Sequence, residues 1–304
     1  MNDTADFINA LNYWFTFITT IILTAVGFIG NTMTILFILR PEIRNISLFR
    51  YILVTMINDC LILVSMWFFM FPEIFMFNTE SCKLTTFWCI LVFKFSGWIV
   101  VVSLVDRLLS VKFPTKFKFR NQLKYQALIL VIILFLLGLL TIVNFTYYDM
   151  HGLTNKNKTF CRIATPQIQF YLILFDSVIA IIIPFILMVI MSIIIGDYLI
   201  KKRKSLKMTK EFKKEIRLIK LMISMSSSFL LFNLPFYILQ LTNYVISIND
   251  PSFFGSNYIF NFIKSITFQI NYTYSSFGFF VCLLSNNVFR KYFYSKFNFS
   301  KRVK

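Results

Sequence analysis

Three ionisable side chains lie deep inside long apolar stretches of the sequence. Asp59, Lys94 and Asp176 are each surrounded by runs of Phe, Ile, Leu, Val and Met. An ionised group in apolar surroundings is costly unless it is hydrogen-bonded, hydrated or paired with an opposite charge. Each of the three is therefore a candidate for binding an ion, a ligand or a second charged side chain. They lie in different stretches and form no recognisable catalytic motif, which argues against a membrane enzyme.

The cysteines and the single histidine show no metal-ligand spacing. They are Cys60, Cys82, Cys89, Cys161, Cys282 and His151. We therefore expect no His/Cys metal centre and no cofactor of that kind. Cys60, Cys89 and Cys282 lie inside apolar stretches, where a free cysteine packs as a small apolar residue.

The elements that must carry these residues are membrane-spanning helices. Hydrophobic residues make up 58% of the chain, charged residues make up 14%, and the mean hydropathy is +0.72. About 20 apolar residues cross the hydrocarbon of a bilayer as a helix. Seven stretches reach this length, at about 15–39, 49–71, 82–111, 126–147, 167–199, 217–245 and 259–285. We therefore predict an all-α membrane protein, with residues 1–304 forming one seven-transmembrane bundle. The chain shows no internal symmetry, which argues against a transporter built from paired halves.

Lysine and arginine set the expected orientation in the lipid bilayer. The net charge is +18, and most basic residues follow the first, third, fifth and seventh stretches. Basic residues gather on the cytoplasmic side of membrane proteins, so we expect residues 1–14 outside and the tail 286–304 inside. The same placement argues against a nucleic-acid partner. Phe289, Phe293 and Phe297 recur every four residues among basic ones, which predicts a short amphipathic helix in the membrane interface.

Motifs in the expected order and at the expected spacing give the chain a family resemblance. Asp59 follows the Gly30–Asn31 pair by 28 residues, and Arg107 follows Cys82 by 25. The remaining motifs are Asp106, Pro184, Phe229, Phe232–Pro235 and Gly278–Phe293. Together they resemble rhodopsin-like G-protein-coupled receptors, and the first and last segments are most similar to invertebrate FMRFamide-type neuropeptide receptors. The resemblance implies a plasma-membrane receptor with a heterotrimeric G protein as its inner partner.

Several residues of the family's conformational switch are replaced. Leu108 follows Asp106–Arg107 where the family has Tyr, and Asn233 stands in place of the sixth-span Trp. The family's Asn-Pro-x-x-Tyr is replaced by Gly278-Phe279-Phe280-Val281-Cys282. Its fourth-span Trp is replaced by Leu134, and its fifth-span Tyr is replaced by Ser192. By resemblance, Asp106, Arg107, Phe229, Asn233 and Pro235 belong to the coupling machinery, with Glu215 as the resting-state partner of Arg107. The replacements lead us to expect atypical coupling.

Three further features are expected outside the switch. Cys82 and Cys161 would form an external disulfide, since both fall on the oxidising side. Asp59 would hold a sodium ion or water together with Asn31 and Ser96, and a structural polar cluster is the alternative. The sequons at Asn2 and Asn157 would be glycosylation sites on the outer side.

The ligand pocket would lie between the outer halves of the helices, lined by Cys89, Lys94, Asp176, Tyr237 and Tyr272. Lys94 lies about 18 Å along the third helix from Cys82, too deep to reach the outer surface easily. We therefore predict that Lys94 pairs with Asp176 on the neighbouring helix, and separate hydration of the two is the alternative. Cys89 stands where amine receptors carry Asp, and Tyr272 where opsins carry the retinal lysine. These replacements argue against an amine ligand and against a visual pigment. The resemblance to FMRFamide-type receptors implies a short peptide ligand, with an orphan chemosensory receptor as the runner-up.

Overall fold

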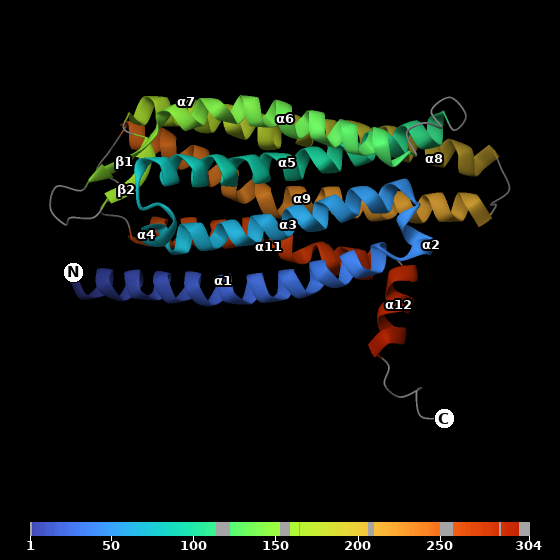
Figure 1. Ribbon diagram of the computed structural model, residues 1–304, viewed down its shortest axis with the longest axis horizontal. Helices are drawn as coiled ribbons and strands as arrows, with labels where there is room; N and C mark the ends of the chain where they lie inside the picture. Colours follow the sequence, from blue (N-terminus) through green and yellow to red (C-terminus); the bar gives the residue numbers. More distant parts are fainter. Residues whose placement is uncertain are drawn as a thin grey trace.

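Long helices run side by side through the whole molecule. The computed structural model describes residues 2–113, 122–152, 159–163, 165–205, 210–249, 258–285 and 287–297. A small two-stranded sheet lies at the end of the bundle that also holds the N-terminus, and a short helix lies at the other end (Figure 1). We call these the hairpin end and the tail end.

The seven expected helices are present, together with shorter elements between them. In chain order the elements are α1 (Asn2–Ile38), α2 (Pro41–Arg44), α3 (Ser47–Met70), α4 (Pro72–Phe75), α5 (Thr79–Lys112), α6 (Leu123–Tyr147), β1 (Tyr148–Gly152), β2 (Thr159–Ile163), α7 (Pro166–Ser177), η2 (Val178–Ile182), α8 (Ile183–Ser205), α9 (Lys210–Asn249), α11 (Tyr258–Ser285) and α12 (Asn287–Phe297). The expected span 167–199 consists of α7, η2 and α8 in one line. The start of the first span is the one substantial correction: α1 begins at Asn2 instead of residue 15, because no Pro or Gly interrupts the chain before Gly27.

Helix α11 differs from the other spans in composition. Among the described residues, six helices or helix combinations are long and apolar enough to cross a membrane on length and composition alone, and α11 is not one of them. Polar residues lower its hydropathy, but four of them, Gln269, Asn271, Ser275 and Ser276, are buried. They face α1, α3 and α9, which pack around this helix. The polarity of α11 therefore belongs to the interior of the bundle, where polar residues of membrane helices usually lie.

A π-helical turn interrupts the fifth span beside Pro184. Proline has no backbone N–H, so the carbonyl of Ala180 cannot receive the usual hydrogen bond from four residues on. The chain widens into η2 at this point. Trp98 of α5 donates its indole N–H to the Ile179 carbonyl at 3.0 Å. A Cβ on Gly97 would lie 3.0 Å from the Ala180 carbonyl oxygen, so a larger residue would push α5 and η2 slightly apart.

The tail helix α12 crosses the bundle axis and packs against α1 and α11 through aromatic rings (Figure 1). Phe289 is buried, with its ring centroid 4.8 Å from that of Phe37 and 5.6 Å from that of Phe279. The Arg40 guanidinium lies 4.4 Å from the centre of the Tyr292 ring. The predicted amphipathic helix is confirmed: one face packs on the bundle, and Lys291 and Tyr294 are exposed on the other.

Candidate functional site

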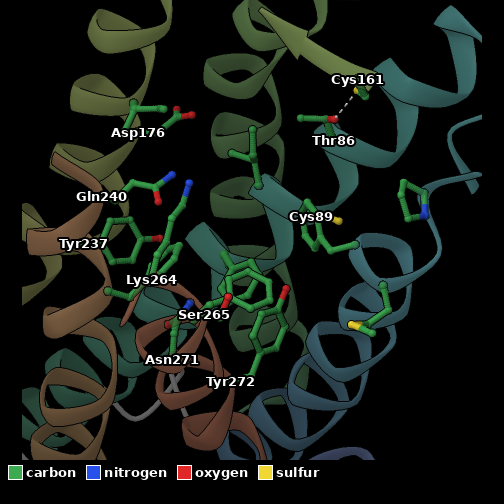
Figure 2. Close-up of a pocket in the computed structure, with 18 of the residues that line it drawn as sticks. Thr86, Cys89, Cys161, Asp176, Tyr237, Gln240, Lys264, Ser265, Asn271 and Tyr272 are labelled. Carbon is green, nitrogen blue, oxygen red and sulfur yellow. Dashed lines mark hydrogen bonds between the residues drawn. The ribbon is translucent and has the colours of Figure 1, made fainter. Parts of the chain in front are cut away.

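A cavity of about 800 Å³ opens between the helices at the hairpin end. Side chains of α1, α3, α5, α7, α9, α11 and the hairpin line it, and Figure 2 draws most of them. The five residues predicted for the ligand pocket all lie in this lining: Cys89, Lys94, Asp176, Tyr237 and Tyr272. Its volume falls in the range of about 300–1,000 Å³ that is usual for ligand sites.

The predicted ion pair between Lys94 and Asp176 is confirmed. The Lys94 ammonium lies 2.6 Å from a carboxylate oxygen of Asp176, and Lys94 is almost fully buried. Lys94 also donates to the Thr141 hydroxyl at 3.1 Å, and the Asn144 amide donates to both Asp176 oxygens at 2.9 and 3.2 Å. These hydrogen bonds offset the cost of removing two charges from water.

The two hydrogen-bond partners of the ion pair on α6 were not predicted. Thr141 and Asn144 are three residues apart in the mainly apolar second half of α6, so they lie on one face. Both are buried, and both reach the ion pair. A polar pair at helical spacing among residues such as Leu, Ile and Phe was the signal that could have identified them.

Aromatic side chains form the deeper part of the cavity. The Tyr272 hydroxyl lies 3.3 Å from the hydroxyl of Ser65, and its ring packs against Phe93 and Phe268. Phe268 also packs against Phe69 and Phe236, with ring centroids 5.8 Å apart in both cases. An apolar part of a ligand can bury its surface against these rings, while the polar groups fix its orientation.

A disulfide holds the hairpin against the start of α5 beside the cavity. Cys82 and Cys161 are bonded, with their Cα atoms 5.6 Å apart, as predicted. The Thr79 hydroxyl donates to the Asp149 carboxylate at 2.7 Å and makes a second link between α5 and β1. Tyr148 and Cys161 both line the cavity, so the hairpin forms part of its wall. The side chain of Asn2 and the whole of Asn157, the two candidate glycosylation sites, lie outside the described residues.

A second polar cluster lies midway along α1, α3, α5 and α11. Both carboxylate oxygens of Asp59, the Asn31 carbonyl oxygen and the Ser96 hydroxyl are buried and have no hydrogen-bond partner within the described part of the chain. The Asn31 amide donates to the Ser275 carbonyl at 3.0 Å, which joins α1 to α11. The Tyr274 hydroxyl, also buried and unbonded, lies within interaction range of Asp59 and Ser96.

This cluster fits a hard cation or ordered water. Buried polar atoms are almost always hydrogen-bonded, so these oxygens from three helices are available to bind such a group. Carboxylate, amide and hydroxyl oxygens are the donors that hard cations prefer. Gly278 adds space, since a Cβ there would lie 2.7 Å from the end of Met56 and 3.5 Å from Asp59. No group of three or more His, Cys, Asp and Glu that could hold a metal ion occurs among the described residues.

At the tail end, Asp106 lies in a hydrogen-bond network that spans three helices. Asp106 accepts from Arg107 at 3.0 Å and from the Ser47 hydroxyl of α3 at 2.8 Å. Gln126 of α6 donates to Ser47 and accepts from the Nε of Arg50. Ser47, Arg50 and Gln126 were not predicted. The side chain of Glu215, the expected partner of Arg107, lies outside the described residues.

The sixth span carries the remaining predicted switch residues on α9. Phe229 is buried, with its ring edge-on to Tyr274 at 5.2 Å. The Asn233 amide donates to the Phe229 carbonyl at 2.6 Å, one turn back along the helix. Pro235 lies inside the same helix and leaves the Leu231 carbonyl without its usual donor. Asn233, which replaces the family's Trp, is therefore hydrogen-bonded within its own helix, two residues before Pro235.

The comparison with known families covers most of the chain. Residues 30–289 match the model described as the seven-transmembrane receptor of the rhodopsin family. No curated protein matches the chain. The matched region begins at Gly30 and ends at Phe289, so it includes the midway cluster, the network at the tail end and all of the described cavity lining except Asn9, Asn12 and Thr16 of α1.

Proposed function

Because the chain belongs to the rhodopsin family of seven-transmembrane receptors, a family of multi-pass membrane proteins, we propose that it binds a short peptide at the cell surface and signals to a heterotrimeric G protein. The observation that carries the proposal is the cavity at the hairpin end, with a buried ion pair and an aromatic floor. A pocket of this size holds the terminal residues of a peptide, and its amide and hydroxyl groups can bond a peptide backbone.

We place the hairpin end outside the cell and the tail end in the cytoplasm, at the plasma membrane. The lysine and arginine residues between spans and after the last one support this orientation. The disulfide supports it independently, because disulfides persist in oxidising surroundings. In this orientation the cavity opens to external ligands, and the network around Asp106 faces the cytoplasm.

We assign the coupling role to Arg107 and the inner ends of α5 and α9. Ligand binding would shift the bundle between two helix arrangements, since a ligand favours the state that it binds more tightly. The polar links from Asp106 to Ser47 and from Ser47 to Gln126 hold α3, α5 and α6 together in the present arrangement. Leu108 stands beside Arg107 where the family has Tyr. We therefore expect the contacts at the inner end of α5, including this network, to differ from the family pattern.

We propose that Asp59 holds a sodium ion or ordered water together with Asn31 and Ser96. The orphaned oxygens in this cluster support the proposal. A bound cation would neutralise the buried carboxylate and tie α3 to α1 and α5, which favours one arrangement of the helices.

A chemosensory receptor for a small molecule is the second candidate. The cavity volume favours it equally, since about 800 Å³ suits a drug-sized molecule. The two candidates share the fold, the cavity and the coupling end, and they differ only in the ligand.

The function is tested by ligand-dependent signalling in transfected cells. Calcium and cyclic-nucleotide responses would be recorded while a library of short peptides, amidated and free-acid, and a library of small odorant-like molecules are applied. The expected result is a response to a peptide that disappears in Arg107→Ala, with surface expression retained. A response confined to small molecules would select the second candidate. Binding without any G-protein response would overturn the coupling role.

A further inference from the structure

A second lysine lines the cavity without a counter-ion. Lys264 lies in the second turn of α11 and is partly buried. Within the ranges that the structure describes, its ammonium group has no hydrogen bond and no ion pair. Burial weakens the solvation of an ammonium group, so an unpaired lysine in a cavity attracts an anion more strongly than one at a surface.

The ion pair cannot neutralise this second lysine. Among the described residues, three charged side chains line the cavity: Lys94, Asp176 and Lys264. One carboxylate oxygen of Asp176 already lies 2.6 Å from the Lys94 ammonium, and the Asn144 amide donates to both oxygens. The described part of the lining therefore carries one net positive charge, and that charge is located at Lys264.

The surroundings of Lys264 are neutral polar groups on one side and aromatic rings on the other. Figure 2 draws Gln240 and Tyr237 of α9 on the same side of the cavity as Lys264. Phe268 follows Lys264 by one helical turn and packs against Tyr272 and Phe236. An anionic group at the lysine would thus have an apolar surface directly beside it.

We propose that the cavity accepts a carboxylate attached to an aromatic or large aliphatic group, with Lys264 as its counter-ion and the rings around Phe268 as its apolar contact. The inference rests on the proposed receptor function and narrows its ligand class. Two sources share this chemistry: the free C-terminus of a peptide that ends in a bulky apolar residue, and a small aryl-substituted organic acid. A C-terminal amide lacks the charge and leaves Lys264 unpaired.

Matched acids and amides test the proposal on the purified full-length receptor. The probes are N-acetyl-phenylalanine and 3-phenylpropionate, each beside its own amide, at millimolar concentration. The readout is the shift of the thermal unfolding temperature, which needs no G protein. We expect the acids to stabilise the receptor and the amides to have little effect. Stabilisation by N-acetyl-phenylalanine alone identifies a peptide terminus, and stabilisation by 3-phenylpropionate alone identifies an organic acid.

Three variants assign the effect to the lysine. Lys264→Gln removes the charge, Lys264→Arg keeps it, and Lys83→Gln removes a charge at the same end of the bundle outside the cavity. Charged hydrogen bonds of this type correspond to roughly a 10- to 100-fold change in affinity. We expect Lys264→Gln to lose this much affinity for the acids. The acid affinities of Lys264→Arg and Lys83→Gln should remain close to that of the wild type.

Two outcomes separate this inference from the receptor function. Equal stabilisation by acids and amides, no stabilisation by either acid, or an acid effect that survives in Lys264→Gln overturns the inference, even if another ligand activates signalling. Acid binding through Lys264, combined with the absence of a G-protein response to every peptide and small molecule applied, supports the inference and overturns the proposed function.

Discussion

Lys94 and Asp176 illustrate how a membrane protein accommodates charge in its interior. The pair is buried, and Thr141 and Asn144 complete its hydrogen bonds from a third helix. Removing one member of a buried pair leaves the other charge uncompensated, whereas exposed pairs contribute little. The same chain contains an exposed pair, Lys201 and Asp197, 2.8 Å apart, which serves as a control.

Charge reversal tests the energetic coupling within the buried pair. Lys94→Asp and Asp176→Lys should each lower thermal stability by about 3–5 kcal/mol, because each places two like charges together. The double variant should recover part of the loss in surface expression and unfolding temperature. The matching reversals at Lys201 and Asp197 should change little. No recovery in the double variant would mean that the two residues act independently.

Asp59 carries a prediction about sodium. The wild-type receptor should unfold at a higher temperature in sodium chloride than in N-methylglucamine chloride at equal ionic strength, since only sodium can fill a small oxygen-lined site. Asp59→Asn should abolish the difference, while the exposed Asp197→Asn should retain it. A sodium effect of equal size in Asp59→Asn would place the ion elsewhere.

Helix packing depends on glycines where two helices come closest. A Cβ on Gly30 of α1 would lie 2.7 Å from the Cβ of Phe279 on α11, which is shorter than any normal contact. A Cβ on Gly138 of α6, by contrast, would have no neighbouring atom within 4 Å. The two glycines therefore have different roles, although both lie inside apolar helices.

Substitution by alanine separates the two roles. Gly30→Ala should destabilise the receptor by about 1–3 kcal/mol, because α1 and α11 must move apart. Gly138→Ala should be neutral or slightly stabilising, since alanine is the better helix former. Thermal unfolding of both purified variants measures the difference. If both substitutions have the same effect, then close approach of α1 and α11 is not what requires Gly30.

The polar content of α11 has a consequence for the assembly of the bundle. Its buried residues include Gln269, whose amide bonds the Thr20 hydroxyl of α1 at 3.3 Å, and Ser276, which donates to the Leu23 carbonyl at 2.8 Å. Interhelical hydrogen bonds of this kind stabilise association where no hydrophobic force acts between helices. α11 is therefore held by its polar contacts as much as by its apolar ones.

The disulfide ties together parts of the molecule that are 79 residues apart in the chain. It fixes β2 to the start of α5 and so keeps the hairpin in the wall of the cavity. Loss of a bridge that closes so long a loop typically costs about 2–4 kcal/mol.

Cys82→Ser and Cys161→Ser should each lower surface expression and thermal stability by a similar amount. The double variant should be no worse than either single variant, because all three lack the same bond. Cys60→Ser, at a free and partly buried cysteine, is the control and should have a smaller effect. Single variants with wild-type stability would show that the hairpin is held by its other contacts, such as Thr79 to Asp149.

The arrangement of the whole molecule follows largely from patterns that the sequence displays. Helix-length apolar stretches predicted the seven spans, since each must satisfy its backbone hydrogen bonds internally in lipid. The basic residues predicted one orientation, and the Phe spacing near Phe289 predicted α12. The start of α1 was misplaced because hydropathy falls before Leu11 although nothing there stops a helix.

The sequence indicated which residues need partners, and the tertiary structure decided which partners they have. The cost of burying Lys94 and Asp176 predicted their pairing once the two helices were taken as neighbours, but Thr141 and Asn144 were found only when α6 was placed beside them. Likewise, Lys264 looked like one of a few basic residues near the outer surface. Its inward position depends on how α11 is rotated against α1, α3 and α9, which is set by side-chain packing between distant parts of the chain and not by any local pattern.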